Sequence, residues 1–196
     1  MTEWYKVCYS ISSSSQITGR ILIVIEILEI AVGVIFFANK VFLLAGKRLG
    51  WFIGTIAATL AFFYFLLLGL YIYTVLEVGL VVLMGYGFLH RRSRRNKKVE
   101  RVLHYTIAII MTVLAYFVFS GLMTMIEFVG AVTMLSGTYY LTHNKMRLGW
   151  AVYGVSHIFV IILAIYANQM FFAHFQMASA IVALVGVING NKNRLE

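Results

Sequence analysis

The sequence predicts an all-α integral membrane protein with seven transmembrane helices. Hydrophobic residues make up 62% of the 196 residues and charged residues only 12%, which leaves too little polar surface for a soluble domain. Seven apolar segments approach the roughly 17–25 residues that a helix needs to cross a bilayer. The segments are continuously apolar rather than alternating, which favours helices over a membrane-spanning β-barrel.

The seven segments follow one another with little chain between them. We expect spans at residues 21–39, 51–68, 70–89, 102–119, 122–141, 149–167 and 170–189. Tight hairpins are predicted at Gly69, at Ser120–Gly121 and at Asn168–Gln169. The chain has no proline, so no helix is broken by a pyrrolidine ring.

The basic residues predict the orientation. With seven spans, the side that carries the N-terminus and the three hairpins holds only Lys6 and Arg20. The opposite side holds the other 14 of the 16 basic residues: Lys40, Lys47, Arg48, the run from Arg91 to Arg101, Lys145, Arg147, Lys192 and Arg194. Cytoplasmic loops carry the excess of Lys and Arg, so we expect the N-terminus outside and the C-terminus in the cytoplasm. The net charge of +9 is therefore interpreted as a topology signal, or as contact with anionic lipid, and not as nucleic-acid binding.

An internal repeat divides the chain. Arg48-Leu49-Gly50-Trp51 recurs as Arg147-Leu148-Gly149-Trp150, an offset of 99 that also aligns Glu77 with Gln176. We predict an N-terminal interfacial segment (1–20), a first three-helix repeat (21–90), a basic loop with a linker helix (91–120), a second repeat (121–190) and a cytoplasmic tail (191–196). The linker gives both repeats the same orientation, a 3+1+3 parallel arrangement with a substrate site expected near the midplane between them.

Carboxylates at membrane depth mark the candidate site, since a charge in the hydrocarbon core costs about 2.5–3.5 kcal/mol on insertion scales. Glu77 lies near the middle of the third span, with Tyr73 one turn before it, and Gln176 takes the equivalent place in the seventh. A carboxylate there would pair with a cationic substrate. The alternative is a protonated Glu77 within helix packing. Glu29 and Glu127 either line the pathway or form hydrogen bonds between helices.

Aromatic side chains supply a second stripe. Trp150, Tyr153 and His157 share one face of the sixth span, where a flat ring could stack and form hydrogen bonds. Trp51 begins the equivalent stripe on the second span. The alternative for Trp51 and Trp150 is an interfacial aromatic belt, because both follow a basic loop.

Several function classes lack their required residues. The last span has no lysine for a retinal Schiff base, the histidines are scattered without a His-Glu-x-x-His pattern, and no phosphate-cradling loop is present. The single cysteine, Cys8, excludes an intrachain disulfide. We therefore expect no enzyme activity and no cofactor.

Three short motifs resemble the PnuC-type bacterial vitamin transporters, across roughly residues 20–190. They are Leu28-Glu29 with Gly33, Gly50-Trp51-Phe52-Ile53-Gly54, and Glu77 followed by Gly85-Tyr86-Gly87-Phe88. The resemblance implies a 3+1+3 fold related to the SWEET sugar transporters and residence in the bacterial inner membrane. It also implies facilitated diffusion of nicotinamide riboside, thiamine or riboflavin, trapping by a cytoplasmic kinase, and a homotrimer.

Two departures bear on the substrate. Nicotinamide riboside members usually carry Gln where this chain has Glu77, and their segment after Gly-Trp usually holds Asn and a further Trp, whereas here it reads Thr55-Ile56-Ala57-Ala58. An added carboxylate suits thiamine, a permanent cation with an aminopyrimidine donor. The thiamine-transporting, PnuT-like branch is favoured, with nicotinamide riboside next. The rival from another class is a non-transporting membrane sensor or assembly subunit.

Overall fold

The structure, a computed structural model, describes residues 15–89, 96–143 and 145–189. Within these ranges it contains only helices: α2 (Ser15–Leu44), α3 (Leu49–Leu67), α4 (Tyr71–Leu89), α5 (Lys97–Phe117), α6 (Leu122–Thr142), α7 (Met146–Tyr166) and α8 (Met170–Asn189). The all-helical prediction is confirmed. Most of the expected interfacial segment, the first part of the basic run (91–95) and the C-terminal tail lie outside the described residues.

Six of the seven described helices are long and apolar enough to cross a membrane. In lipid a helix satisfies its own backbone hydrogen bonds, so long apolar runs of Leu, Ile and Val adopt this structure. The seventh, α5, has a shorter apolar stretch at Arg101–Phe117 because its first turn is charged. The first helix is longer than the expected span of 21–39, because nothing between Asn39 and Leu44 breaks it.

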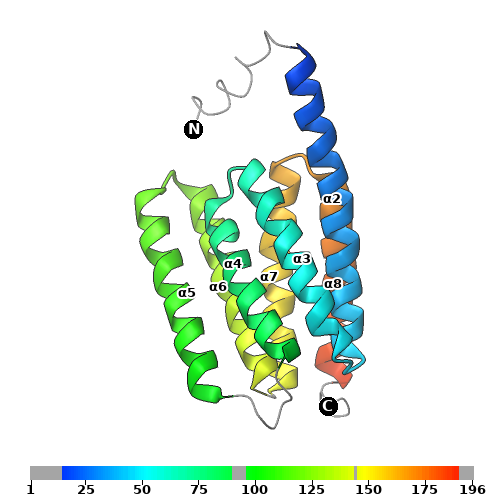
Figure 1. Cartoon of the computed structure of the whole chain (residues 1–196), viewed down its shortest axis with the longest axis vertical. Coiled ribbons are helices and arrows are strands. Elements are labelled where there is room, and N and C mark those ends of the chain that lie inside the picture. The colour runs from blue at the N-terminus through cyan, green and yellow to red at the C-terminus, as the bar shows by residue number, and fades with distance from the viewer. Residues whose placement is uncertain (1–14, 90–95, 144, 190–196) are drawn as a thin grey trace.

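The three predicted hairpins are confirmed. Each contains one residue with a left-handed backbone: Gly69 (φ 71°), Gly121 (φ 108°) and Asn168 (φ 57°). Gly69 and Asn168 follow the C-caps of α3 and α7, whereas Gly121 is the N-cap of α6, and each allows the chain to reverse. These three turns lie at the same end of the bundle, called here the hairpin end, and the connections near Lys47 and Lys145 lie at the opposite, basic end (Figure 1).

Six helices form a closed ring. Each packs on its two neighbours in the order α2, α3, α4, α6, α7, α8 and back to α2. Helix α5 stands outside this ring, in contact with α4 and α6 (Figure 1). The outer face of the ring exposes large apolar side chains such as Phe63, Ile158 and Ile181, which is the surface that lipid requires.

At the basic end, glycines allow α2 to approach α3 closely and α6 to approach α7 closely. A Cβ atom at Gly50 would lie 2.9 Å from the backbone nitrogen of Leu43, and one at Gly149 would lie 2.9 Å from that of Leu141. Small residues at helix interfaces permit this kind of contact in membrane proteins. The same contact therefore joins α2 to α3 and α6 to α7.

Both tryptophans of the repeated motif are inside the bundle. Trp51 is 4% exposed and packs on Gly87 of α4, while Trp150 is 1% exposed and packs on Gly186 of α8. An interfacial belt would leave the indoles in the headgroup region. The belt interpretation is therefore replaced by tight packing between a Trp of one helix and a Gly of the next.

Candidate functional site

A cluster of buried polar groups without partners lies inside the helix ring. Glu77 on α4 is fully buried, and neither of its carboxyl oxygens has a hydrogen-bond partner among the described residues. The same holds for four other atoms of α4, α7 and α8: Tyr73 Oη, Trp150 Nε1, His157 Nε2 and Ser179 Oγ. A buried polar group left unpaired costs about 1–3 kcal/mol. Such a concentration of them is typical of a site that receives a polar ligand.

Gln176 forms its hydrogen bond with His157. The Nδ1 atom of His157 lies 2.7 Å from Oε1 of Gln176, and both side chains are buried. With the amide oxygen as acceptor, Nδ1 is the donor. The other ring nitrogen, Nε2, is then the atom of His157 that is available to a ligand. The sequence aligned Gln176 with Glu77 as a facing pair, whereas its hydrogen-bond partner is a residue of its own repeat.

Lys40 is a charged residue that the sequence reasoning missed. It is 1% exposed, and its ammonium donates to Oδ1 of Asn39 at 3.1 Å. The ammonium also lies 4.6 Å from the ring centroid of Tyr153 and 4.9 Å from that of Phe36, which are cation–π distances. Lys40 interacts electrostatically with Glu77. A buried lysine thus lies in the same interior as the buried Glu77.

Lys40 was expected among the basic residues of the cytoplasmic side, and the structure places its side chain inside the bundle, near the basic end of α2. Helix α2 continues to Leu44, which carries Lys40 inside the helical segment. A signal for this existed in the sequence, because Val32, Phe36, Lys40 and Leu43 recur at helical spacing and all four are buried. An apolar stripe that contains one Lys indicates a lysine turned toward the interior.

Glu29 and Glu127 each bind the N-terminus of a neighbouring helix in the ring. Oε1 of Glu127 accepts hydrogen bonds from the backbone amides of Ile72 (2.8 Å) and Tyr73 (3.1 Å) at the start of α4. Oε1 of Glu29 accepts one from the amide of Phe172 (3.0 Å) at the start of α8. The first amides of a helix lack partners within it and carry a partial positive charge, so a carboxylate stabilises them. Glu29 and Glu127 were expected either to line the pathway or to form hydrogen bonds between helices. The structure shows the hydrogen bonds between helices.

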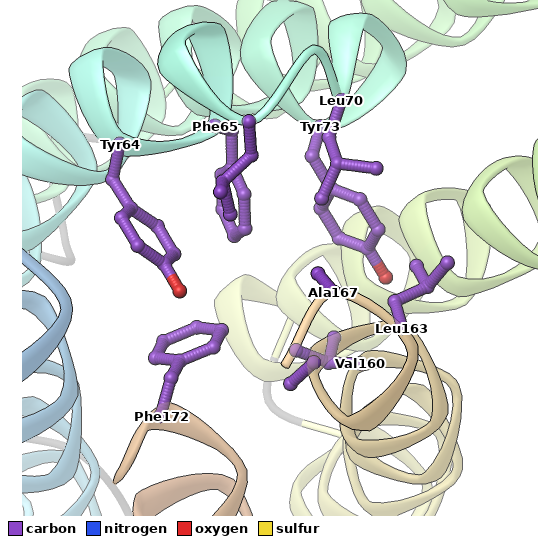
Figure 2. A pocket seen from close by; sticks show the side chains of 10 residues that line it. Tyr64, Phe65, Leu70, Tyr73, Val160, Leu163, Ala167 and Phe172 are labelled. Carbon is purple, nitrogen blue, oxygen red and sulfur yellow. The ribbon is translucent and has the colours of Figure 1, made fainter. Parts of the chain in front are cut away.

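A cavity opens at the hairpin end of the ring, one turn from Glu77. Four aromatic side chains line it, from α3 (Tyr64, Phe65), α4 (Tyr73) and α8 (Phe172), together with aliphatic residues of α7 (Figure 2). We call it the aromatic pocket. It contains about 240 Å³ of space that no atom fills, including the part open to the outside. The sequence predicted a site at the midplane, and of its residues only Tyr73 also lines this pocket.

The arrangement suits noncovalent binding. Glu77 can accept hydrogen bonds or pair with a cation, the indole and phenols can donate, and several rings offer faces for stacking. No group of three or more potential metal ligands occurs in the described ranges. The interior therefore contains hydrogen-bonding groups and aromatic rings that can bind a ligand, and apolar helices enclose them.

A ring of apolar helices around a buried polar cluster defines a multi-pass membrane protein of the transporter class. The profile of the nicotinamide mononucleotide transporter family matches residues 24–192, and the chain belongs to this family. The match confirms the resemblance to the PnuC-type transporters and points to membrane transport rather than catalysis. Comparison with curated proteins and with solved structures finds no match.

Proposed function

We propose that the chain is a facilitated-diffusion carrier for a cationic B vitamin, with thiamine as its principal substrate. The observation that carries this proposal is the Glu77 carboxylate, which is fully buried with both oxygens unpartnered. A carboxylate in this position attracts a positive charge and accepts hydrogen bonds from an amine. Thiamine offers both, a permanent cation and an aminopyrimidine donor.

In the empty carrier, Lys40 acts as the counter-charge of Glu77. Its ammonium already rests on the ring of Tyr153 at 4.6 Å, so a lysine of the chain demonstrates that this ring accepts a cation. An arriving cation takes over the interaction with Glu77, and Lys40 keeps its contacts with Asn39 and Phe36. Without substrate, the interior therefore contains one matched pair of charges, Lys40 and Glu77.

The remaining site residues orient the substrate's rings. Trp150 and Tyr153 offer a ring pair with centroids 6.4 Å apart, and the indole nitrogen of Trp150 is unpartnered among the described residues. Gln176 holds the His157 ring so that Nε2 meets the ligand. Together with Glu77 these groups recognise a flat heterocycle by stacking and by hydrogen bonds.

Repeated contacts support the 3+1+3 arrangement and its repeat boundaries. Glu29 binds the amide of Phe172, and Glu127 binds that of Tyr73, so each carboxylate holds the third helix of the other proposed repeat. Glu127 follows Glu29 by 98 positions, and Phe172 follows Tyr73 by 99 positions. Both separations match the offset of the sequence repeat. Two three-helix units arranged about an axis along the membrane normal would produce such reciprocal contacts.

Nicotinamide riboside is the second candidate substrate. It also carries a cationic ring, and the description of the family names a nicotinamide compound. Its discrimination from thiamine depends on the aminopyrimidine, which only thiamine has. The outward N-terminus, the bacterial inner membrane, the homotrimer and the trapping kinase remain predictions that accompany either substrate.

The test is isothermal titration of the purified protein with thiamine, nicotinamide riboside, nicotinamide mononucleotide and riboflavin. We expect thiamine to bind, and Glu77→Gln to weaken its binding about tenfold or more, because a buried charge partner is removed. Glu26→Gln is the matched control, since Glu26 is a carboxylate on the exposed face of α2.

Each outcome has a defined meaning. No heat with thiamine at high micromolar concentration overturns the thiamine assignment, and heat with nicotinamide riboside alone replaces the substrate. Equal affinity for Glu77→Gln and Glu26→Gln removes Glu77 from the site. Binding without uptake into proteoliposomes supports a membrane sensor in place of a carrier.

A further inference from the structure

One turn deeper than the glycine contacts at the basic end, the α2–α3 and α6–α7 pairs differ. In the first pair, a Cβ atom at Gly54 would lie 2.6 Å from Nδ2 of Asn39. At the offset of 99, Gly54 corresponds to Tyr153 of α7. Gly137 follows Asn39 by 98 positions, and a Cβ atom there would lie 2.8 Å from the Tyr153 ring. The large side chain at this contact is therefore an amide of α2 in one pair and a ring of α7 in the other.

Lys40 contacts both of these large side chains. Its ammonium donates to Oδ1 of Asn39 at 3.1 Å and lies 4.6 Å from the centroid of the Tyr153 ring. Asn39 is fully buried, and its Nδ2 donates to the carbonyl oxygen of Gly50 on α3 at 2.7 Å. The amide group is thus fixed by α3 on one side and accepts from the lysine on the other, so the place of the ammonium depends on Asn39.

The ammonium of Lys40 forms no hydrogen bond with Glu77. Both carboxyl oxygens of Glu77 lack a hydrogen-bond partner among the described residues, although the two side chains interact electrostatically. A lysine has a flexible four-carbon stem, and opposite charges attract strongly in an interior of low dielectric constant. Without a competing acceptor, the ammonium would therefore move to the carboxylate. The resulting ion pair would occupy the oxygens that the substrate needs.

We propose that Asn39 is a positioning residue, which holds the Lys40 ammonium back and keeps the Glu77 carboxylate open to the cation of the substrate. Lys40 then balances the charge of Glu77 without competing for its oxygens. Gly54 contributes to this arrangement, because a larger side chain there would displace the amide group of Asn39. This inference rests on the proposed function, because it assigns the carboxylate to a cationic substrate.

The first test is isothermal titration of the purified protein with thiamine and with nicotinamide riboside. Asn39→Leu keeps the size of the side chain and removes both of its hydrogen bonds. We expect the Kd to rise about five- to tenfold, because the ion pair of Lys40 with Glu77 has to break before the substrate binds. In Asn39→Leu/Lys40→Met no ammonium competes, so the Kd should equal that of Lys40→Met alone. Asn39→Ala gives the same comparison if the Leu variant does not fold.

Thr55→Val is the matched control for the loss of a polar atom on the α3 side of this contact. The hydroxyl of Thr55 donates to the carbonyl oxygen of Trp51 within the same helix at 3.0 Å. It therefore holds no group of another helix in place, and its removal should leave the Kd unchanged.

The second test needs no substrate. We expect Glu77→Gln to lower the unfolding midpoint in detergent and dodecyl sulfate more in Asn39→Leu than in the otherwise unmodified protein. The reason is that only Asn39→Leu allows a direct ion pair, and removal of one partner from a buried ion pair leaves the other charge uncompensated.

The outcomes separate the positioning role from the proposed function. If the unmodified protein binds a cation but Asn39→Leu binds it equally well, the positioning role is wrong while the proposed function stands. Weakening by the same factor with and without Lys40 shows a purely structural role for Asn39 and also overturns the inference. If the unmodified protein binds neither cation, the proposed function fails. The unfolding midpoints then decide whether Asn39 restrains Lys40, and an equal effect of Glu77→Gln in both backgrounds refutes the restraint.

Discussion

Removal of the two helix-capping carboxylates should destabilise the protein to different extents. Glu127 accepts two backbone hydrogen bonds at the start of α4, and Glu29 accepts one at the start of α8. The residues that donate them, Ile72, Tyr73 and Phe172, are at most 2% exposed. Substitution by Ala leaves these amides without a partner, and water does not reach them in the packed ring.

The size of the effect follows from the number of amides. An unpaired buried donor costs about 1–3 kcal/mol, so Glu127→Ala should cost about 2–6 kcal/mol and Glu29→Ala about 1–3 kcal/mol. Substitution by Gln keeps an acceptor oxygen but removes the charge. Since charge-assisted hydrogen bonds are roughly twice as strong as neutral ones, each Gln variant should lose about half as much as the Ala variant.

Unfolding in mixed micelles of a mild detergent and dodecyl sulfate, followed by circular dichroism, measures these differences. Glu26→Ala is the control, because it removes an exposed carboxylate from α2 and should leave the midpoint unchanged. The expected order of loss is Glu127→Ala, then Glu29→Ala, then Glu26→Ala. If Glu29→Ala lowers the stability as much as Glu127→Ala or more, the explanation by the number of unpaired amides is refuted.

Two further predictions concern the interior. Lys40→Met should slow net uptake into substrate-free vesicles about tenfold or more, and it should spare the exchange of internal for external substrate. The reason is that only the empty carrier depends on Lys40 to balance the charge of Glu77. Equal slowing of net uptake and exchange would contradict this role. Gly186→Ala should lower the unfolding free energy by about 1–3 kcal/mol and shift tryptophan fluorescence, because the added methyl overlaps the indole of Trp150. Gly154→Ala, whose methyl would meet its nearest neighbour at 3.6 Å, should change neither quantity.

The helices and turns were predictable because their causes are local. Apolar runs of sufficient length adopt helices in lipid, and Gly69, Gly121 and Asn168 are residue types that tolerate a left-handed backbone. Helix α5 was less clear, since its apolar stretch is interrupted by charges at one end. The ends of α2 were misjudged because a helix continues past the hydrophobic core until something stops it.

The candidate site was predictable only in part. Glu77, His157 and Gln176 were identified from the cost of polar groups at membrane depth, and all three are buried. The partner of Glu29 was not accessible to the same reasoning, because it is a backbone amide 143 positions away that has no side-chain signature. Lys40 was missed for a different reason, namely that a lysine near a span end is usually a topology signal.

The ring has two seams, one between α2 and α8 and one between α4 and α6, and each is closed at the hairpin end by a single carboxylate. Helix α5 lies across the outside of the α4–α6 seam, and no described helix covers the other (Figure 1). Among the described helices, α5 alone therefore separates a seam of the ring from the surrounding lipid. Bilayer composition and lateral pressure would act differently on the two seams of this membrane protein.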